Sequence, residues 1–208
     1  MIEQLEKILA KRSTVKNFNG NPLESNHIST ITEAVAKTPS CNNRYNFKVK
    51  VLGQKLNDRK AKLNLYDYVC TVSKENVRYS EDEDLMVIRS PKSYKEARDW
   101  HNKNILSSRI NGQMLAPLVL VWYFTDGDAI ENDYLDIGLS CWNTVITSEL
   151  LGIQSGFCSC FDADYLQNFL GIEGKPVVMA GFGYAQSIIS NDEKHSNNPR
   201  PSSSDILV

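Results

Sequence analysis

The first part of the chain shows two kinds of hydrophobic periodicity. Residues 2–11 place their apolar side chains three and four positions apart, which predicts an amphipathic helix. A second helix is expected to begin near Ser25 and to end before Pro39, because the residue before a proline disfavours helical backbone. Residues 47–51 alternate apolar and polar side chains, as a half-buried strand does. The chain is therefore expected to begin with two helices and a strand.

The later segments are more strongly apolar. Residues 117–124 form a continuous apolar run, which is typical of a strand covered on both faces. Residues 133–151 are apolar almost all round and finish at Gly152, which predicts a buried central helix with a glycine cap.

A short helix and a last strand are expected near the C-terminal end. Asp162 or Asp164 can cap a helix that Gly171 stops, and residues 176–184 are interpreted as a strand. The tail over residues 190–208 is rich in Asn, Ser and Pro. A polar tail of that kind is either free or ordered by wrapping a neighbouring molecule.

Residues 54–112 are polar, charged and rich in tyrosine, and they are interpreted as helical pieces split by an acidic run and by Pro91. Their apolar content is too small for an independent core, so we expect a single domain over residues 1–208 with a helical excursion at about 54–112. Strands interleaved with helices favour an α+β or α/β layered fold. No glycine-rich loop of the Rossmann or P-loop kind follows any strand, so neither nucleotide site is expected.

Composition and charge narrow the class of protein. Lys and Arg (23) nearly cancel Asp and Glu (25), and a nucleic-acid binder needs a dominant positive field. The longest apolar stretches, such as residues 115–124, are too short to span a bilayer, and the N-terminal residues lack a signal-peptide pattern. Five cysteines without disulfide spacing indicate reduced thiols. These features predict a cytoplasmic globular protein with no nucleic-acid or membrane partner.

Cys158 and Cys160 stand two positions apart, which suggests a metal or redox site as one interpretation. A tetrahedral zinc site needs four ligands, and no second Cys or His pair has a suitable spacing. The alternative, buried cysteine acting as a small hydrophobic residue, is the commoner case. No metal site is predicted.

Two polar clusters carry the candidate chemistry. Arg12, Ser13, Thr14 and Lys16 supply two cations and two hydroxyls, which can neutralise and hydrogen-bond a phosphate dianion. Residues 38–47 supply hydroxyl, amide and guanidinium groups between a helix and a strand. Taken alone, the first cluster is also compatible with solvated surface and the second with a plain connecting loop.

Taken together and in order, these segments resemble the nitroreductase family of flavoenzymes over nearly the whole chain. That family opens with R-x-[ST]-x-[RK]-x-F and continues with A-P-S-x-x-N-x-Q-P-W-x-F. The matching positions are Arg12, Thr14, Lys16 and Phe18; Pro39, Ser40, Asn43 and Phe47; Ala116-Pro117; Asp136-Ile137-Gly138 through Leu151-Gly152-Ile153; Phe161-Asp162, which closes a strand in the family; Gly181 to Tyr184; and Arg200-Pro201.

The resemblance implies an α+β fold with a central mixed or antiparallel sheet flanked by helices, in a homodimer with exchanged tails. It also implies a set of FMN-binding residues. Arg12, Ser13, Thr14 and Lys16 would hold the phosphate and ribityl chain, and Arg200 would close on the phosphate. Pro39, Ser40, Cys41 and Asn43 would reach the isoalloxazine ring from the partner subunit. Ser159 and Cys160 would offer main-chain N–H groups to the ring, and Arg109, Asn111 and Gln113 lie near the stretch that offers an amide.

The implied activity is reduction of a nitroaromatic, quinone or similar small acceptor by NADH or NADPH, in a ping-pong scheme through the flavin. Hydride transfer at the flavin N5 requires no catalytic side chain. The alternatives are other flavin chemistry on this fold, such as dehalogenation or flavin breakdown, and a non-catalytic flavin carrier or scaffold. Residues 54–112 would be either a lid over the flavin or a solvated helical pair.

The sequence departs from the family pattern in three places. Tyr45-Asn46 stands where the family often has Gln-Pro, and Trp142-Asn143 replaces Gln-Asn in the central helix. Residues 157–160 replace aliphatic or glycine residues of the late strand. These departures bear on the substrate class and the flavin potential rather than on the fold.

Overall fold

A four-stranded sheet forms the centre of the protein. The computed structural model describes residues 2–76, 92–103, 112–125, 129–159, 161–186 and 206. The strands within this part are β1 (Phe47–Leu52), β2 (Leu118–Phe124), β3 (Gln154–Cys158) and β4 (Pro176–Gly183). They lie in the order β1-β2-β4-β3, and each neighbouring pair is antiparallel.

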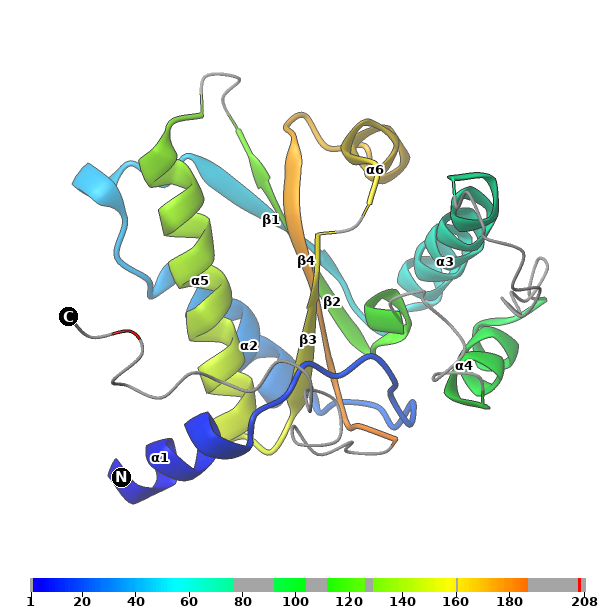
Figure 1. Ribbon diagram of the computed structural model, residues 1–208, viewed down its shortest axis with the longest axis horizontal. Helices are drawn as coiled ribbons and strands as arrows, with labels where there is room; N and C mark the ends of the chain where they lie inside the picture. Colours follow the sequence, from blue (N-terminus) through cyan, green and yellow to red (C-terminus); the bar gives the residue numbers. More distant parts are fainter. Residues whose placement is uncertain are drawn as a thin grey trace.

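Helices cover both faces of the sheet (Figure 1). The described helices are α1 (Ile2–Lys11), α2 (Ser25–Ala36), α3 (Leu56–Asn76), α4 (Tyr94–Lys103), α5 (Glu131–Leu150) and α6 (Ala163–Leu170), with short 3-10 turns η1 (Cys41–Asn43) and η2 (Gly112–Leu115). Helices α2 and α5 lie on one face; α3, α6 and η2 lie on the other, and α4 packs on α3 and η2. This arrangement confirms the expected α+β fold.

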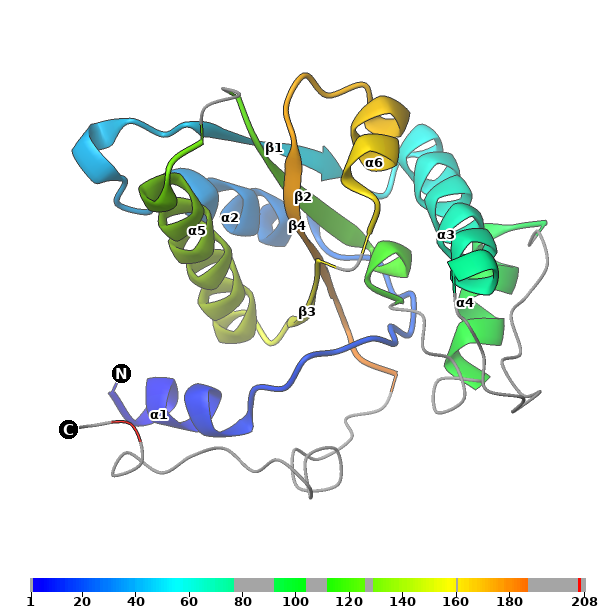
Figure 2. The same cartoon turned by 45° about the horizontal axis from the view of Figure 1, so that its top comes forward.

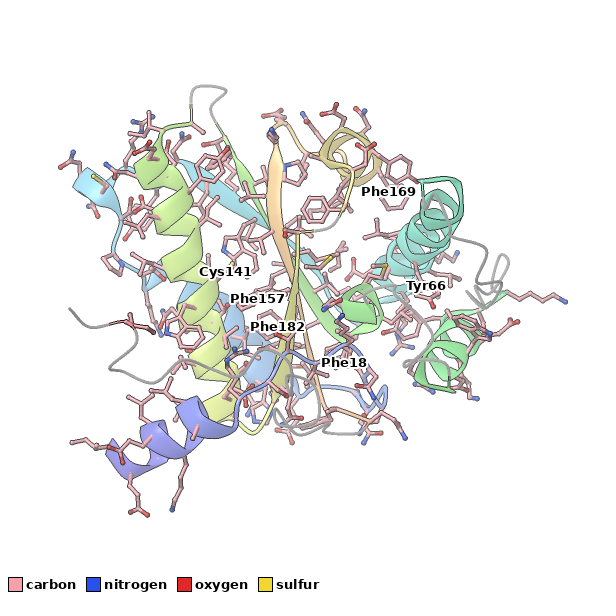
Figure 3. The ribbon with its side chains drawn as sticks, in the orientation of Figure 1. Phe18, Tyr66, Cys141, Phe157, Phe169 and Phe182 are labelled. Carbon is pink, nitrogen blue, oxygen red and sulfur yellow. The ribbon has the colours of Figure 1, made fainter. Side chains whose placement is uncertain are left out.

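Two apolar cores result, one on each face of the sheet. Trp122 and Phe182 face α2 and α5 in the first core, whereas Tyr66 of α3 packs with Val119 and Met179 in the second. Figure 3 shows the division, with Phe157 and Phe182 on the α5 side and Tyr66 and Phe169 on the other. Strand β2 is buried on both faces over almost its whole length, as its continuous apolar run predicts.

The helix ends follow the expected capping residues, but the third strand is shorter than expected. The Asp162 side chain accepts a hydrogen bond from Tyr165 N–H, and Gly171 adopts a left-handed conformation at the end of α6. Strand β3 ends at Cys158, so the expectation that a strand closes at Phe161-Asp162 is wrong. The ladder of β3 with β4 ends at the Cys158–Met179 pair, and the Asp162 carboxylate serves instead as the N-cap of α6.

Helix α5 differs from the buried central helix that its composition predicts. One face packs on the sheet and α2 through residues such as Ile137 and Val145. The opposite face carries Leu135, Leu139 and Trp142, which are 60%, 39% and 41% exposed. The prediction of complete burial is therefore wrong for this single chain, because the sheet and α2 cover only one side of the helix. Among the described residues, no helix has the length and apolarity needed to cross a membrane.

A buried lysine fastens the helical excursion to the sheet. Lys62 of α3 is 1% exposed, and its Nζ donates to Ala116 O at 2.7 Å and to Pro117 O at 3.0 Å, immediately before β2. The hydroxyl of Tyr94, from α4, donates to the Leu115 and Ala116 carbonyl oxygens. Both helices are thus anchored to carbonyl groups at the start of β2. Burial lowers the pKa of Lys62 to about 7, with Asp58 partly opposing that effect.

Replacing Lys62 by methionine is expected to remove a pH dependence of stability. Between pH 7 and pH 9 the unfolded wild-type chain keeps the Lys62 proton, while the folded chain loses it. The free energy of unfolding should therefore rise with pH, relative to Lys62→Met, by up to roughly 1.4 kcal/mol per pH unit. Urea unfolding at pH 7, 8 and 9 measures this, with Lys60→Met, an exposed lysine of α3, as the control. Parallel pH profiles for wild type and Lys62→Met would contradict the expectation.

Candidate functional site

The segment after α1 runs beside the end of the sheet. Val15 N–H donates to Ser155 O of β3 at 2.9 Å, and Asn19 N–H donates to Tyr184 O at 2.9 Å. The side chains of Val15 and Phe18 are buried in the core. Because alternate residues of this segment are buried, Thr14 and Lys16 lie on its more accessible side, with Thr14 half-buried and Lys16 exposed.

Two glycines allow this segment and η2 to approach the sheet closely. A Cβ on Gly156 of β3 would lie 1.9 Å from Val15 O and 3.2 Å from Gln113 Nε2. A Cβ on Gly181 of β4 would lie 2.4 Å from Gln113 O. These separations are too short for any side chain, so the absence of Cβ atoms brings residues 12–16 and Gln113 onto the same part of the sheet.

Gln113 carries an unused acceptor at this place. Its side chain is fully buried, and Nε2 donates to Phe157 O at 3.0 Å. Oε1 is buried and has no hydrogen-bond partner among the described residues. A buried amide oxygen without a donor is costly. It is therefore a group that a bound molecule with an N–H donor would satisfy.

Arg12 lies on the C-terminal half of α5. Its guanidinium carbon is 5.5 Å from the centre of the Trp142 ring, a cation–π distance. Its charge also acts on Glu149, opposing the burial that raises the pKa of that carboxyl group. The ring and the carboxylate thus hold the Arg12 guanidinium against α5. Trp142 occupies the position where the sequence departs from the family's glutamine.

The loop between α2 and β1 is fastened to the other end of α5. Ser40 Oγ donates to Asp136 Oδ2 at 2.7 Å, and Cys41 N–H donates to the same carboxylate at 3.1 and 3.2 Å. Tyr45 N–H donates to Ser40 Oγ at 2.9 Å. The Asp136 side chain is 3% exposed, so this carboxylate is buried under the loop that it holds.

A second buried carboxylate, Asp133, holds the end of this loop. Asn46 Nδ2 donates to Asp133 Oδ2 at 3.1 Å, and the Arg44 guanidinium lies 3.8 Å from the same oxygen. The hydrogen bond from Ile130 N–H lowers the pKa of Asp133. Asp133 therefore both caps α5 and fixes the residues that lead into β1.

The loop backbone is strained between these two anchors. Asn42, Asn43 and Tyr45 have φ angles of 53°, 60° and 45°, in the left-handed region. Asparagine tolerates this conformation, but a bulky residue such as tyrosine in that region costs roughly 1–2 kcal/mol. Contacts to Asp133 and Asp136 offset the strain, and the result is a loop of defined shape with exposed side chains at Cys41, Asn42 and Asn43.

The structure brings together some of the predicted site residues and separates others. Arg12, Ser13, Thr14, Lys16 and Gln113 gather at the β3 edge. Ser40 and Cys41, with their neighbours Pro39 and Asn43, are held by Asp136 near the N-terminal end of α5, whereas Arg12 lies over Trp142 in the C-terminal half of the helix. Asp136 and Trp142, the α5 residues that contact the loop and Arg12, are separated along the helix by roughly 9 Å. Within one chain, the two predicted clusters are therefore held at different positions along α5.

The remaining predicted residues are only partly described. Ser159 is exposed and follows β3 directly. Arg109, Asn111, Cys160 and Arg200 lie outside the described residues. The sequence patterns do not predict a role for Asp133, nor the contacts of Asp136 and Trp142. The usable signal is the pair of carboxylates, Asp133 and Asp136, three residues apart on an otherwise apolar helix.

Of the two cysteines considered for a metal or redox site, Cys158 is buried, and Cys160 lies outside the described residues. Cys141 is buried and Cys41 is exposed, and neither forms a disulfide among the described residues. Burial raises the pKa of the Cys141 thiol. Within the described ranges, no three side chains of His, Cys, Asp or Glu come close enough together to hold a metal ion.

The fold and this arrangement define the class of protein. The chain matches the nitroreductase family over residues 9–184, and it belongs to that family. No curated protein matches the chain in sequence.

Solved structures with the same fold are distant in sequence. A nitroreductase with bound FMN from Desulfitobacterium hafniense DCB-2 is 18% identical, with 100% of this chain and 98% of that chain covered and a TM-score of 0.64. The FMN-dependent nitroreductase NfnB from Mycobacterium smegmatis, in complex with NADPH, is 18% identical, with coverages of 97% and 100% and a TM-score of 0.63. An FMN-dependent nitroreductase from Clostridium difficile R20291 is 15% identical, with coverages of 98% and 99% and a TM-score of 0.61.

Proposed function

We propose that this protein is an FMN-dependent oxidoreductase that uses NADH or NADPH to reduce a nitroaromatic, quinone or similar small acceptor. The observation that carries the proposal is the meeting of residues 12–16 with the buried Gln113 acceptor at the β3 edge. Membership of the nitroreductase family and the FMN-bound and NADPH-bound structures with this fold support the same cofactors.

The residues at the β3 edge fit FMN. Arg12 and Lys16 supply two positive charges for a phosphate dianion, and the hydroxyls of Ser13 and Thr14 can donate to its oxygens. Gln113 Oε1 suits the N–H group of the oxidised isoalloxazine ring, because it is an acceptor with no donor of its own among the described residues. When bound, FMN supplies the hydride-transfer chemistry. The protein binds and orients the ring, and the Lys16 charge would favour the anionic reduced form.

We also propose that two copies of the chain complete the site. The loop at residues 39–43 is held by Asp136 near the N-terminal end of α5, whereas Arg12 lies over Trp142 in the C-terminal half, and a partner subunit would place the loop over a ring held at the β3 edge. The exposed face of α5, with Leu135, Leu139 and Trp142, supplies an apolar surface for the second copy. The apolar residues of α1, which projects from the body beside α5 (Figure 2), are also exposed and extend this surface.

Leu139→Glu is expected to convert the dimer to monomers. The leucine is exposed in the single chain, so the fold should tolerate the change, but a dimer would have to bury an unpaired carboxylate from each copy. The dimer dissociation constant should rise by about a hundredfold or more. Light scattering after gel filtration measures this, with Leu56→Glu as the control, since Leu56 is 68% exposed at the start of α3. A Leu139→Glu protein that remains dimeric would exclude this face as the interface.

A visible absorption spectrum tests the function. The purified protein would be titrated with FMN, desalted, and then mixed with NADH or NADPH without oxygen. Retained flavin bands that bleach with either nicotinamide support the reductase, and bands that do not bleach support a carrier. Absence of saturable FMN binding would refute the proposal and favour a scaffold that retains only the fold.

We further propose that residues 1–208 act as one cytoplasmic domain. The α3–α4 excursion shares the second core of the sheet and is anchored by Lys62, which supports a single folding unit. The thiols of Cys41 and Cys141, which form no disulfide among the described residues, are compatible with a reducing compartment. Limited proteolysis would test the domain proposal, because an independent excursion would be released as a stable fragment.

A further inference from the structure

Asp136 is a buried carboxylate that the proposed flavin chemistry does not itself use. We infer that Asp136 is a positioning residue, whose carboxylate holds residues 40–45 in the conformation that presents the loop to the flavin of the partner subunit. The inference rests on the proposed function, since it names a further residue of the same site. It concerns the loop's shape rather than the atoms that react.

Within the part of the chain that the structure describes, the Asp136 carboxylate accepts hydrogen bonds from two groups, and both belong to the loop. Ser40 Oγ–H and Cys41 N–H both point at Asp136, with the distances of 2.7 Å and 3.1–3.2 Å given above. An ionised carboxylate is an acceptor at both oxygens, whereas the asparagine side chain has one acceptor and one donor group. In Asp136→Asn, an N–H group would therefore face one of the loop's own donors.

The Ser40 hydroxyl links Asp136 to Tyr45 through two hydrogen bonds. A hydroxyl has one proton, and the Ser40 proton is directed to Asp136, so the oxygen is free to accept from Tyr45 N–H. The Tyr45 hydroxyl in turn donates to Thr38 O at 2.8 Å, which closes the loop on its own beginning. The left-handed backbone at Asn42, Asn43 and Tyr45 lies entirely within this closed stretch.

This chain of hydrogen bonds also decides which loop groups can contact a ligand. The Ser40 hydroxyl proton is already donated within the protein. The side chains of residues 41–45 are exposed, but three of them already make contacts within the protein. The Cys41 sulfur accepts from Asn132 Nδ2 at 3.4 Å, the Arg44 guanidinium lies 3.8 Å from Asp133 Oδ2, and the Tyr45 hydroxyl donates to Thr38 O. The loop groups that remain to contact a ring are therefore the two asparagine amides, presented at a position that Asp136 sets.

Amide hydrogen exchange of the full-length protein, followed by NMR, tests the anchor without any flavin. Asp136→Asn should accelerate exchange at Cys41 and Tyr45 by about tenfold, the effect of losing a charge-assisted hydrogen bond. Ser40→Ala should release the Tyr45 amide but leave the Cys41 amide protected, which keeps the test decisive if Asp136→Asn folds poorly. Thr144→Val is the matched control, because the buried Thr144 hydroxyl bonds only within α5, to Cys141 O. Unchanged exchange at Tyr45 in Ser40→Ala, or at both amides in a folded Asp136→Asn, would overturn the inference.

The flavin-loaded protein tests the positioning role. Asp136→Asn should raise the FMN dissociation constant about tenfold and change the visible circular dichroism of the bound ring, while Thr144→Val changes neither. If Asp136→Asn loosens the loop but leaves the FMN affinity and the visible circular dichroism unchanged, this inference is overturned and the proposed function is not. A wild-type protein that binds no FMN would overturn the proposed function and the flavin role of Asp136 together.

Discussion

Gly156→Ala is expected to lower the free energy of unfolding by about 3 kcal/mol, at the upper end of overpacking effects. The added methyl group would lie 1.9 Å from Val15 O, so backbone rather than a flexible side chain must move. That movement stretches the Val15–Ser155 hydrogen bond and shifts residues 12–16 away from Gln113. FMN affinity should therefore fall together with stability.

Urea unfolding followed by circular dichroism would measure the loss, and FMN titration of the folded variant would measure the change in affinity. Gly53→Ala is the matched control: a methyl group there makes an ordinary 3.4 Å contact with Asp58, and stability should change by no more than about 0.5 kcal/mol. Equal stabilities for the two variants would show that the N-terminal segment does not lie against β3.

Arg12→Ala is expected to raise the FMN dissociation constant by roughly 10- to 100-fold. A charge-assisted hydrogen bond to phosphate contributes about 1.5–3 kcal/mol, and each 1.4 kcal/mol changes affinity about tenfold. Arg12 is prepositioned by the Trp142 ring, so little conformational entropy opposes the contact. The loss should therefore exceed that of an ordinary surface cation.

A titration that follows the quenching of FMN fluorescence on binding measures this dissociation constant. Lys7→Ala is the control, because it removes the same charge from a highly exposed position. Lys7 lies on α1 and pairs with Glu3. The Arg12→Lys variant should recover part of the affinity, since it restores the charge without the planar fork. FMN affinity that is the same in Arg12→Ala and wild type would refute the phosphate assignment.

Much of the fold could be predicted because its elements are encoded locally. The spacing of Ile28, Ile31 and Ala34 placed the buried side of α2, and Asp162 and Gly171 marked the ends of α6. These signals act between neighbours in sequence, where helical and strand geometry is the same in every protein. Residues 12–16 could be recognised for the same reason, since their cations and hydroxyls are consecutive.

Solvent exposure was harder to predict, as α5 and β1 illustrate. Val51 continues the alternating pattern of β1 but is 43% exposed, while Leu52 is buried in the second core. Leu139 and Trp142 are apolar in a helix whose other face is buried. A hydrophobic pattern identifies which side chains prefer burial, but whether another element covers them depends on the lengths and crossing of the packed layers.

The sequence by itself determined the elements, the apolar stripes and the chemical character of residues 12–16 in this protein. Only the tertiary structure decided that Gln113 meets residues 12–16, that Asp136 holds a loop 95 residues earlier at Cys41, and that this loop stands away from Arg12. The physical reason is that such contacts join residues far apart in sequence. These contacts form only after the sheet and α5 have packed and after Val15 and Gln113 lie against Gly156 and Gly181. No local pattern in the sequence specifies them.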